Sequence, residues 1–398
     1  MLSIALFSEC YHPMRNGVVV SVSSFAHMLK LMGHTVTIFT AHHPQQLPEI
    51  NEGVYRFLSV PVPSRARYPL PLPVASAEVW SALEELPFDI VHANSPMVLG
   101  HVARAMTQRR NLPFIFTYHT LIEEYGHYLP LPQGLTRRWA VRVSREFSNS
   151  ADHIIAPSEH VAERLRFYRV TKPISVIPTG IDIDLIDAVP PADIRARFAI
   201  PAAAPLLLYA GRLAREKNLP RLMSMLRIVL SEEPDTHMLL VGGGPFEEEI
   251  HTLCAESHLG SRVHMAGFLP REQVFQCMRA ADVFVFASLT ETQGLVVGEA
   301  MACGTPVVAV EAEAECEVIT SGVDGLLVPN ADEPFAEAVL TLLRDRALHD
   351  AMGHRARLRA ENLSARLRTE QLLEVYQEVV DNYTPHAGEH HFWAQDKC

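Results

Sequence analysis

The sequence predicts an α/β fold of two domains, each built around a parallel sheet. The chain has 398 residues, which exceeds one compact core at roughly 100 to 200 residues per domain. Its composition, 48% hydrophobic and 20% charged, is typical of a globular protein. Short β-branched or aromatic runs alternate with longer amphipathic stretches throughout the chain, and this alternation is the pattern of βα units.

The first half of the chain carries six predicted strands with helical segments between them. Together they form a predicted domain over residues 1–178. The strands are expected at residues 4–7, 36–40, 90–93, 114–118, 154–156 and 175–177, and helices at 20–32, 97–110 and 136–148.

A proline-rich stretch after residue 178 predicts a linker, because closely spaced prolines interrupt helices and strands. A second domain is then predicted over residues 203–365, followed by a helix at about 366–383. Residues 384–398 contain His386, His390 and His391 without core periodicity, so we interpret them as a tail. The strands of the second domain are expected at residues 206–210, 238–241, 263–266, 283–286, 307–309 and 325–328.

Charge and cysteine content narrow the class of protein. The net charge of −12 argues against nucleic acid as a main partner, because phosphate contacts dominate that affinity. The charge is uneven, with 16 basic against 13 acidic residues in 1–178 and 18 against 33 in the remainder. The six cysteines are scattered without a C-x-x-C pair, and there is neither an 18-residue apolar run nor a secretion signal. These features predict a cytoplasmic protein.

The segment from Glu291 to Glu299 is the strongest local signal. A helix beginning near Gly294 would place Glu299 on an apolar face, since its neighbours one turn away are all apolar. A buried carboxylate needs hydrogen-bond donors, which either a ribose diol or a structural ion pair would supply. Glu291 would lie at the start of this helix, beside free N–H groups that suit a phosphate or a polar sugar.

Two further strand ends in the second half suggest phosphate binding. Arg212 and Lys217 follow a predicted strand with Gly211, and they can converge on a diphosphate. The run Val241-Gly-Gly-Gly-Pro245 is a glycine turn before a helix. It lacks the G-x-G-x-x-G spacing and the acidic residue about 20 positions later, which disfavours a dehydrogenase.

In the first half, Arg15-Asn-Gly17 opens a helix, so that backbone amides near Gly17 can approach an anion. His119 lies at the carboxyl end of a predicted strand, where ligands of open α/β sheets bind. A structural histidine is the alternative. Asp182-Ile-Asp184 has the form of a D-x-D metal motif, but it falls in the predicted linker, and we expect no metal site.

These motifs occur in the order found in a known family. Arg15-Asn-Gly-Val18, His119, Pro178-Thr-Gly-Ile-Asp182, the Gly211 to Asn218 run, the glycine turn and the E-x7-E segment together resemble family 4 retaining glycosyltransferases of the GT-B fold. The likeness extends from about residue 3 to residue 382. It implies two Rossmann-like domains facing across a cleft, with the acceptor site in the first and the donor site in the second. The helix near 366–383 is expected to return to the first domain.

The resemblance also implies roles for individual residues. Glu299 would bind the donor ribose, Arg212 and Lys217 the diphosphate, and Glu291 hydroxyls of the transferred sugar. His119 would contact the sugar near the reacting carbon and Gly17 would close over the phosphates, whereas Gly267 and Phe268 would lie near the base. The implied donor site also includes Thr292, Gln293, Gly294 and Leu295.

Within the family, residues 288–295 and 117–128 are most similar to bacterial 1,2-diacylglycerol 3-glucosyltransferases. That likeness implies transfer of glucose from UDP-glucose to a lipid hydroxyl, without a metal or other cofactor, at the cytoplasmic face of a membrane. Arg138, Arg142 and Arg145 share helical spacing beside Trp139, and this stripe could meet an anionic surface. An ordinary half-buried helix is the alternative.

Other functions remain open from sequence alone. The same fold could use GDP-mannose or UDP-N-acetylglucosamine on another lipid or on a soluble acceptor. A non-catalytic sugar-nucleotide binding protein is an alternative from another class, although both glutamates and both cations are intact. The sequence therefore predicts a retaining hexosyltransferase and leaves the donor and the acceptor undetermined.

Overall fold

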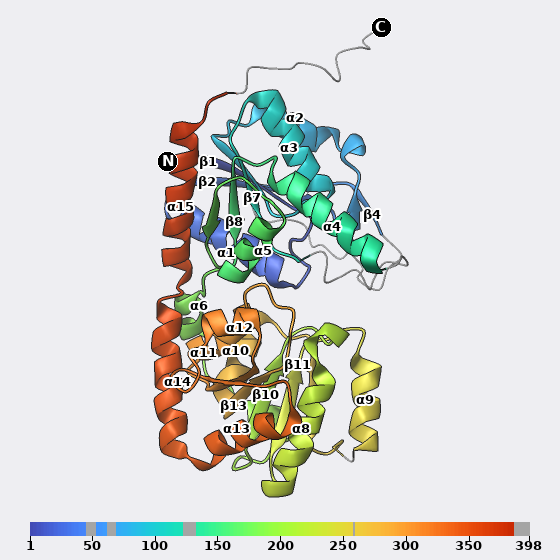
Figure 1. Cartoon of the computed structure of the whole chain (residues 1–398), viewed down its shortest axis with the longest axis vertical. Helices are drawn as coiled ribbons and strands as arrows, with labels where there is room; N and C mark the ends of the chain where they lie inside the picture. Colours follow the sequence, from blue (N-terminus) through green and yellow to red (C-terminus); the bar gives the residue numbers. More distant parts are fainter. Residues whose placement is uncertain (45–52, 62–68, 122–132, 258, 386–398) are drawn as a thin grey trace.

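The computed structural model describes residues 1–44, 53–61, 69–121, 133–257 and 259–385. The chain forms two α/β domains stacked along the long axis of the molecule (Figure 1). Two long helices run along one side, with α14 (Arg346–Glu361) beside the second domain and α15 (Ala365–Asn382) beside the first.

The first domain is built on a seven-stranded sheet in the order β3-β2-β1-β6-β7-β8-β9, in which every pairing is parallel. A separate antiparallel pair, β4 and β5, lies beside it. The strands are β1 (Ser3–Ser8), β2 (Thr35–Ala41), β3 (Val54–Phe57), β4 (Ser59–Pro61), β5 (Pro69–Pro71), β6 (Ile90–Ala93), β7 (Phe114–Thr117), β8 (His153–Ala156) and β9 (Ile174–Val176). The helices are α1 (Gly17–Leu31), η1 (Pro73–Ala75), α2 (Ala77–Glu85), α3 (Val98–Arg110), α4 (Gln133–Ser148) and α5 (Glu159–Phe167).

The second domain has a six-stranded sheet in the order β12-β11-β10-β13-β14-β15, again entirely parallel. Its strands are β10 (Leu206–Ala210), β11 (His237–Val241), β12 (Val263–Gly267), β13 (Val283–Phe286), β14 (Val307–Val310) and β15 (Leu326–Val328). Its helices are η3 (Arg215–Lys217), α8 (Leu219–Glu232), α9 (Glu247–Glu256), α10 (Arg271–Ala280), α11 (Leu295–Ala302), α12 (Glu313–Val318) and α13 (Asp332–Arg344). In both sheets the strand order reverses beside the first strand, which is the Rossmann arrangement.

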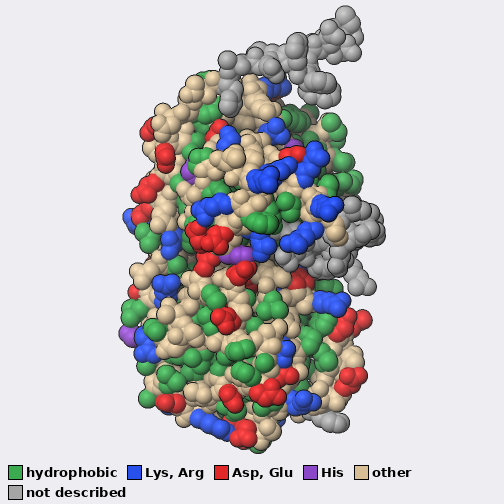
Figure 2. All heavy atoms as spheres, in the orientation of Figure 1, with side chains coloured by type: hydrophobic (Ala, Val, Ile, Leu, Met, Phe, Trp, Pro, Cys, Tyr) green, Lys and Arg blue, Asp and Glu red, His purple; other side chains and the backbone are tan. Residues whose placement is uncertain are grey.

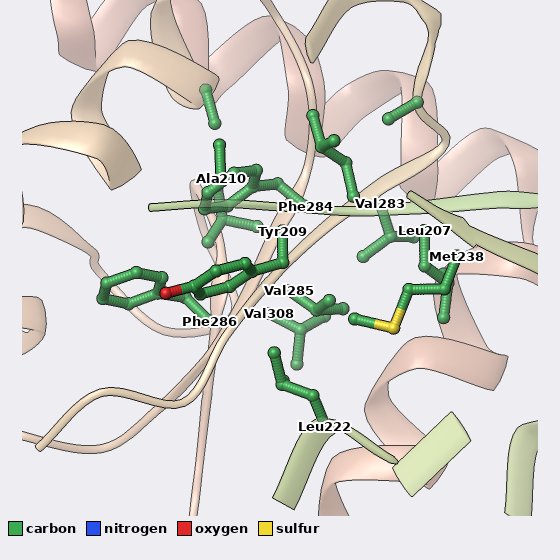
Figure 3. Close-up of a cluster of buried hydrophobic side chains, with 14 of the residues drawn as sticks. Leu207, Tyr209, Ala210, Leu222, Met238, Val283, Phe284, Val285, Phe286 and Val308 are labelled. Atoms are coloured by element: carbon green, nitrogen blue, oxygen red, sulfur yellow. The ribbon is translucent and has the colours of Figure 1, made fainter. Parts of the chain in front are cut away.

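Buried side chains of neighbouring strands form the core of the second domain (Figure 3). Leu207 and Tyr209 of β10 pack there with Met238 of β11, Phe284 of β13 and Leu222 of α8, all without exposed surface. Strands covered on both faces require continuous apolar runs. This requirement explains why the sequence located these strands to within one or two residues.

The helix α15 packs on the first domain. Its Leu372, Val375 and Tyr376 belong to the core formed by α1, β1 and β2. The Tyr376 hydroxyl lies 2.6 Å from Nδ1 of the buried His92 of β6, whose Nε2 lies 2.6 Å from the Thr117 hydroxyl. Burial lowers the pKa of His92 to about 3, so this imidazole is neutral at physiological pH.

The stretch between the sheets differs from the predicted linker. It contains two short helices, α6 (Ile183–Ala188) and α7 (Ile194–Arg197). Ile186 and Ile194 are buried in the core of the second domain. The prolines do interrupt regular structure, but the apolar residues between them pack on the second sheet. Sequence reasoning also missed β3, β4 and β5, because β3 has only four residues and the three-residue strands β4 and β5 contain prolines.

Candidate active site between the domains

Loops at the carboxyl ends of the strands bring the two domains together. Arg15, in the loop after β1, donates from Nη1 to the carbonyl of Leu269, in the loop after β12, at 3.3 Å. A cavity of about 460 Å³ lies farther along this boundary and is lined by α5 of the first domain and by the β14–α12 connection of the second. A smaller pocket beside it is lined by Leu121 and Arg164 on one side and by Glu291 on the other. The candidate site therefore lies in a cleft between the domains.

Lys217 and Glu291 form an ion pair at this edge, although 74 positions separate them in the sequence. Both side chains are largely buried. The loop after β10 carries Lys217 and the loop after β13 carries Glu291, and the adjacent parallel strands bring these loops together. The predicted diphosphate cation and the predicted sugar-binding carboxylate are thus in direct contact.

Glu315 of α12 lies close to this pair and was not predicted from the sequence. Its side chain has no exposed surface, and neither carboxyl oxygen has a hydrogen-bond partner among the described residues. Burial, reinforced by the negative charge of Glu291, raises the pKa of Glu315 to about 8. The carboxyl group is therefore mainly protonated at neutral pH, which avoids the cost of an uncompensated buried charge.

Arg212 lies in the same loop as Lys217 and pairs with Glu216, one helical turn further along. The two predicted phosphate-binding cations are thus both held by carboxylates. A diphosphate that approaches them would exchange one anionic partner for another, and Arg212 is suited to this exchange because its side chain is about one third exposed, at 37%.

Glu299 of α11 is buried, as its position on an apolar helix face predicted. Its Oε1 accepts a hydrogen bond of 2.8 Å from Nη2 of Arg271, at the start of α10. Arg271 also lies over the Phe275 ring, with its Cζ 5.3 Å from the ring centroid. One of the two interpretations offered for Glu299, a structural ion pair, is therefore present, and Arg271 is a site residue that sequence reasoning missed.

The glycine turn at residues 242–244 is explained by close packing. A Cβ on Gly242 would lie 1.9 Å from the carbonyl oxygen of Gly211, and one on Gly244 would lie 2.2 Å from that of Leu213. A Cβ on Gly243 would meet the Phe268 ring at 2.5 Å. These glycines let the loops after β10, β11 and β12 lie directly against one another at the sheet edge.

The helix α11 begins where the sequence placed it. Gly294 is its N-cap, with a φ of +69° that favours glycine, and Leu295 is its first residue. The first turn of a helix leaves backbone N–H groups available to a ligand. Thr292 lies in the preceding loop. The side-chain amide of Gln293 is hydrogen-bonded to the backbone of Thr179. Thr179 lies in the segment between β9 and β10, residues 177–205, which we call the crossover between the domains.

Arg15, two residues before the predicted phosphate-closing Gly17, contacts the loop of the predicted base-binding residues across the domain boundary. Gly267 ends β12 with a φ of +64°, and the Phe268 ring after it is 60% exposed. The Cζ of Arg15 lies 5.9 Å from the centroid of that ring. Gly17 is the first residue of α1, which begins three residues earlier than predicted because Asn16 caps it by accepting from the Val19 amide.

His119 is half-buried at the end of β7, with its Nε2 2.9 Å from Oδ1 of Asn94, at the end of β6. Burial lowers the pKa of His119 to about 4. Its imidazole is therefore neutral near pH 7, and it donates from Nε2 to Asn94, so that Nδ1 remains an acceptor. Residues 122–132, which carry most of the lipid-transferase likeness near His119, lie outside the described residues.

A second set of contacts joins α5 to α12 across the cleft. The Glu317 carboxylate accepts two hydrogen bonds of 2.8 Å from the backbone amides of Glu159 and His160, at the start of α5. Oε2 of Glu313 lies 2.7 Å from Nε2 of His160. A carboxylate at a helix N-terminus is electrostatically favourable, so these contacts stabilise the observed orientation of the domains.

The predicted basic stripe lies on the first domain, apart from the residues of the second domain just described. Arg138 and Trp139 are exposed on α4, Arg142 is exposed and pairs with Glu146 at 2.7 Å, and Arg145 is half-exposed. We call these four residues the α4 stripe. Figure 2 shows Lys and Arg side chains gathered on the face of the first domain that carries α4. Among the described residues, no helix has both the length and the apolar character needed to cross a membrane.

The D-x-D sequence in the crossover has a structural role. Oδ1 of Asp182 caps α6 by accepting from the Leu185 amide at 3.0 Å, and Asp184 lies in the first turn of that helix. Within the described ranges, no group of three or more His, Cys, Asp or Glu side chains has an arrangement that could hold a metal ion.

Two Rossmann-like domains with the carboxyl edges of their sheets meeting at one cleft define the architecture of a GT-B glycosyltransferase. Comparison of the sequence with known families agrees with this assignment. Residues 15–185 match the family described as Glycosyltransferase Family 4, and residues 192–359 match Glycosyl transferases group 1. The chain belongs to these GT-B glycosyltransferases, and the predicted fold class, family and enzyme class are confirmed.

Individual relatives and solved structures are similar at modest identity. The alpha-monoglucosyldiacylglycerol synthase of Streptococcus pneumoniae is 28% identical over 77% of this chain and 71% of its own length. The GDP-mannose-dependent alpha-mannosyltransferase of Mycolicibacterium smegmatis is 28% identical over 89% of this chain and 92% of its own. The sucrose-phosphate synthase structure from Thermosynechococcus elongatus superposes with a TM-score of 0.79 at 26% identity, covering 96% of this chain and all of that one.

Proposed function

We propose that this glycosyltransferase moves glucose from UDP-glucose, with retention of configuration, to the hydroxyl group of a lipid such as diacylglycerol. One observation carries the proposal. Lys217 pairs with Glu291, which precedes α11 by four residues; Arg212 lies in the same loop as Lys217, and Glu299 is buried on α11 itself. A nucleotide sugar needs this combination, because it presents a diphosphate between two sets of hydroxyl groups.

The donor would lie along the edge of the second domain. Glu299 would accept hydrogen bonds from the ribose hydroxyls while Arg271 holds one of its oxygens. Arg212 and Lys217 would bind the diphosphate, together with the backbone amides at Gly294 and Leu295. The base would lie near Gly267 and Phe268, and closure of the loop at Gly17 would cover the phosphates from the first domain.

In the transfer step, the bond between the anomeric carbon and the diphosphate oxygen breaks, and a bond to the acceptor oxygen forms on the same face. The acceptor proton passes to an oxygen of the leaving diphosphate. Lys217 and Arg212 stabilise the negative charge that develops on that diphosphate, which is usually the largest catalytic contribution in such reactions. Glu291 would hold sugar hydroxyls, and the neutral His119 would contact the sugar near its reacting carbon.

The first domain, residues 1–178, would bind the acceptor. The exposed α4 stripe supports a membrane-bound acceptor, since basic and aromatic side chains together favour an anionic lipid surface. The name of the Streptococcus pneumoniae relative, which specifies an alpha-monoglucosyl diacylglycerol product, supports the same acceptor and an α linkage. UDP-glucose is itself an α-glycoside, so an α product implies retention.

A second donor class has its own support. The Mycolicibacterium smegmatis relative is named as GDP-mannose-dependent, and none of the described contacts of Glu299 or Lys217 distinguishes uracil from guanine. The same site could therefore bind GDP-mannose. UDP-N-acetylglucosamine is a further alternative within the same architecture.

The test is a matrix of donors and acceptors with nucleotide release as the readout. The protein is incubated with UDP-glucose, GDP-mannose or UDP-N-acetylglucosamine, each with and without diacylglycerol in anionic vesicles. The expected result is UDP release that requires both UDP-glucose and diacylglycerol, with an α-glucosyl lipid as product. If GDP-mannose is the only donor that gives nucleotide release, the proposed donor is wrong and GDP-mannose takes its place. If turnover occurs only with a soluble acceptor, the proposed lipid acceptor is wrong.

A further inference from the structure

The side-chain amide of Gln293 binds both backbone polar groups of a single residue, Thr179, in the crossover between the domains. Its Oε1 accepts from the backbone N–H of Thr179 at 2.8 Å, and its Nε2 donates to the carbonyl of the same residue at 2.8 Å. Two hydrogen bonds to the same residue fix the position of the side-chain amide, as paired hydrogen bonds fix neighbouring strands in a sheet. The hydrogen-bonding groups of Gln293 are thus directed to the crossover.

Thr179 is in turn bonded to the first domain. It is buried, and its hydroxyl donates to the Ser21 hydroxyl of α1 at 2.8 Å. Gln293 therefore forms one end of a continuous chain of hydrogen bonds that runs from the loop before α11, through the crossover, to α1.

The crossover is tightly packed beside Thr179, so a displacement of Thr179 also displaces the residues packed against it. Ile181 donates to Leu363 and accepts from Ala365, both at 2.8 Å, which joins the two strands of chain that pass between the domains. A Cβ on Gly180 would lie 2.3 Å from the Cα of Ala365. The two crossing segments thus behave as one rigid unit.

Gln293 also lies within the segment that the proposed function assigns to the donor. It follows Glu291 by two residues and directly precedes Gly294, the N-cap of α11. A shift of the loop that contains Gln293 would therefore displace Thr179. A rotation of the domains about the crossover would displace this loop in turn.

We propose that Gln293 is a positioning residue that couples occupancy of the donor site to the orientation of the two domains. The inference rests on the proposed function, because it takes the segment from Glu291 to Glu299 as the donor site. Gln293 keeps the loop in its binding geometry only while Thr179 occupies the observed place in the crossover. Coupling of this kind is reciprocal, so a bound nucleotide must also stabilise the crossover.

Kinetics of a volume-matched variant provide the first test. Gln293→Met keeps the length of the side chain and removes both hydrogen bonds to Thr179. The expected result is a rise of about tenfold in KM for the nucleotide sugar with kcat changed less than threefold, because fewer molecules are in the binding-competent orientation. The matched control is Gln276→Met, since Nε2 of Gln276 also donates to a backbone carbonyl, that of Pro190 between α6 and α7, in a stretch whose apolar residues pack on the second sheet.

A variant at the other end of the chain separates coupling from direct donor contact. Thr179→Val keeps the backbone groups that bind Gln293 and removes only the hydroxyl that reaches Ser21. Coupling predicts that Thr179→Val also raises the donor KM, and that the effects of Thr179→Val and Gln293→Met are not additive. Additive effects, or an unchanged KM in Thr179→Val, would show that Gln293 acts on the donor directly and would overturn the proposal.

Hydrogen exchange at residues 178–181 gives a readout besides activity. The Thr179 amide should exchange faster in Gln293→Met than in the parent, and UDP should slow that exchange in the parent but not in the variant. Unchanged exchange on adding a nucleotide that binds would refute the coupling while leaving the donor site intact. If neither UDP nor GDP binds the parent in a calorimetric titration, the proposed function itself fails.

Discussion

Replacing Glu299 tests the donor site most directly, and the structure determines how the result must be read. In Glu299→Ala the ribose would lose a charged acceptor, and Arg271 would lose its partner at 2.8 Å. Hydrogen bonds to a charged group contribute about 1.5–3 kcal/mol. Loss of the ribose contacts should therefore weaken UDP binding about 10- to 100-fold, at about 1.4 kcal/mol per factor of ten.

The ion pair adds a second effect on stability. The side chain of Glu299 is 11% exposed and that of Arg271 is 32% exposed, so their contact is intermediate between a surface pair and a buried one. Surface pairs contribute about 0–1 kcal/mol, whereas breaking a buried pair costs about 3–5 kcal/mol. We therefore expect Glu299→Ala to lower the free energy of unfolding of the second domain by about 1–2 kcal/mol, within this range, while the domain remains folded.

Calorimetric titration with UDP, run beside a matched variant, separates these two effects. Arg271→Met breaks the same ion pair and leaves the Glu299 carboxylate available to the ribose. The expected result is a large loss of UDP affinity in Glu299→Ala and a small loss in Arg271→Met. Equal losses would mean that the ion pair acts only by placing α11, and unchanged affinity in Glu299→Ala would refute the ribose assignment.

Three further predictions concern metal, membrane and pH. Activity should persist in excess EDTA, because Arg212 and Lys217 supply the positive charge that a metal ion supplies elsewhere; complete loss that Mg²⁺ restores would contradict this. Changing the three arginines of the α4 stripe to glutamine should weaken sedimentation with anionic vesicles at low salt about 100-fold, at about 1 kcal/mol per basic residue, and equal binding to neutral vesicles would exclude an electrostatic role. Because the folded-state pKa of Glu315 is raised to about 8 from the ordinary value of 4.5, the folded protein holds an extra proton between these values, and stability should fall as pH rises through this window. Glu315→Gln should remove at least about 1 kcal/mol of that fall, which urea unfolding at pH 6 and pH 8.5 would measure.

Sequence alone could predict the parts of the fold that depend on local pattern. The strands β10 and β13 have the predicted bounds, because a strand buried on both faces is a continuous apolar run that ends where polar loop residues begin. The burial of Glu299 followed in the same way from helical periodicity. The helix α1 begins three residues before its expected start at residue 20, because Asn16 caps it.

Partners that come from elsewhere in the fold could not be predicted. Arg271 lies 28 positions before Glu299, in a different βα unit, and nothing in its local sequence indicates an ion pair. Glu315 belongs to a run of alternating acidic residues that looks solvent-exposed in the sequence, yet it is fully buried. Only the path of the β14–α12 connection decides which of these glutamates points inward.

The pairing of each predicted phosphate-binding cation with a carboxylate has a consequence for how the site discriminates. Arg212 is held by Glu216 and Lys217 by Glu291, so a free anion gains little by replacing one carboxylate on one cation. A nucleotide sugar offers more, because its diphosphate can bind both cations while its sugar hydroxyls occupy the released Glu291. The complete donor is thus favoured over inorganic phosphate. When the donor breaks the ion pair between Lys217 and Glu291, its diphosphate binds the lysine and its sugar hydroxyls bind the glutamate, whereas phosphate leaves the glutamate without a partner.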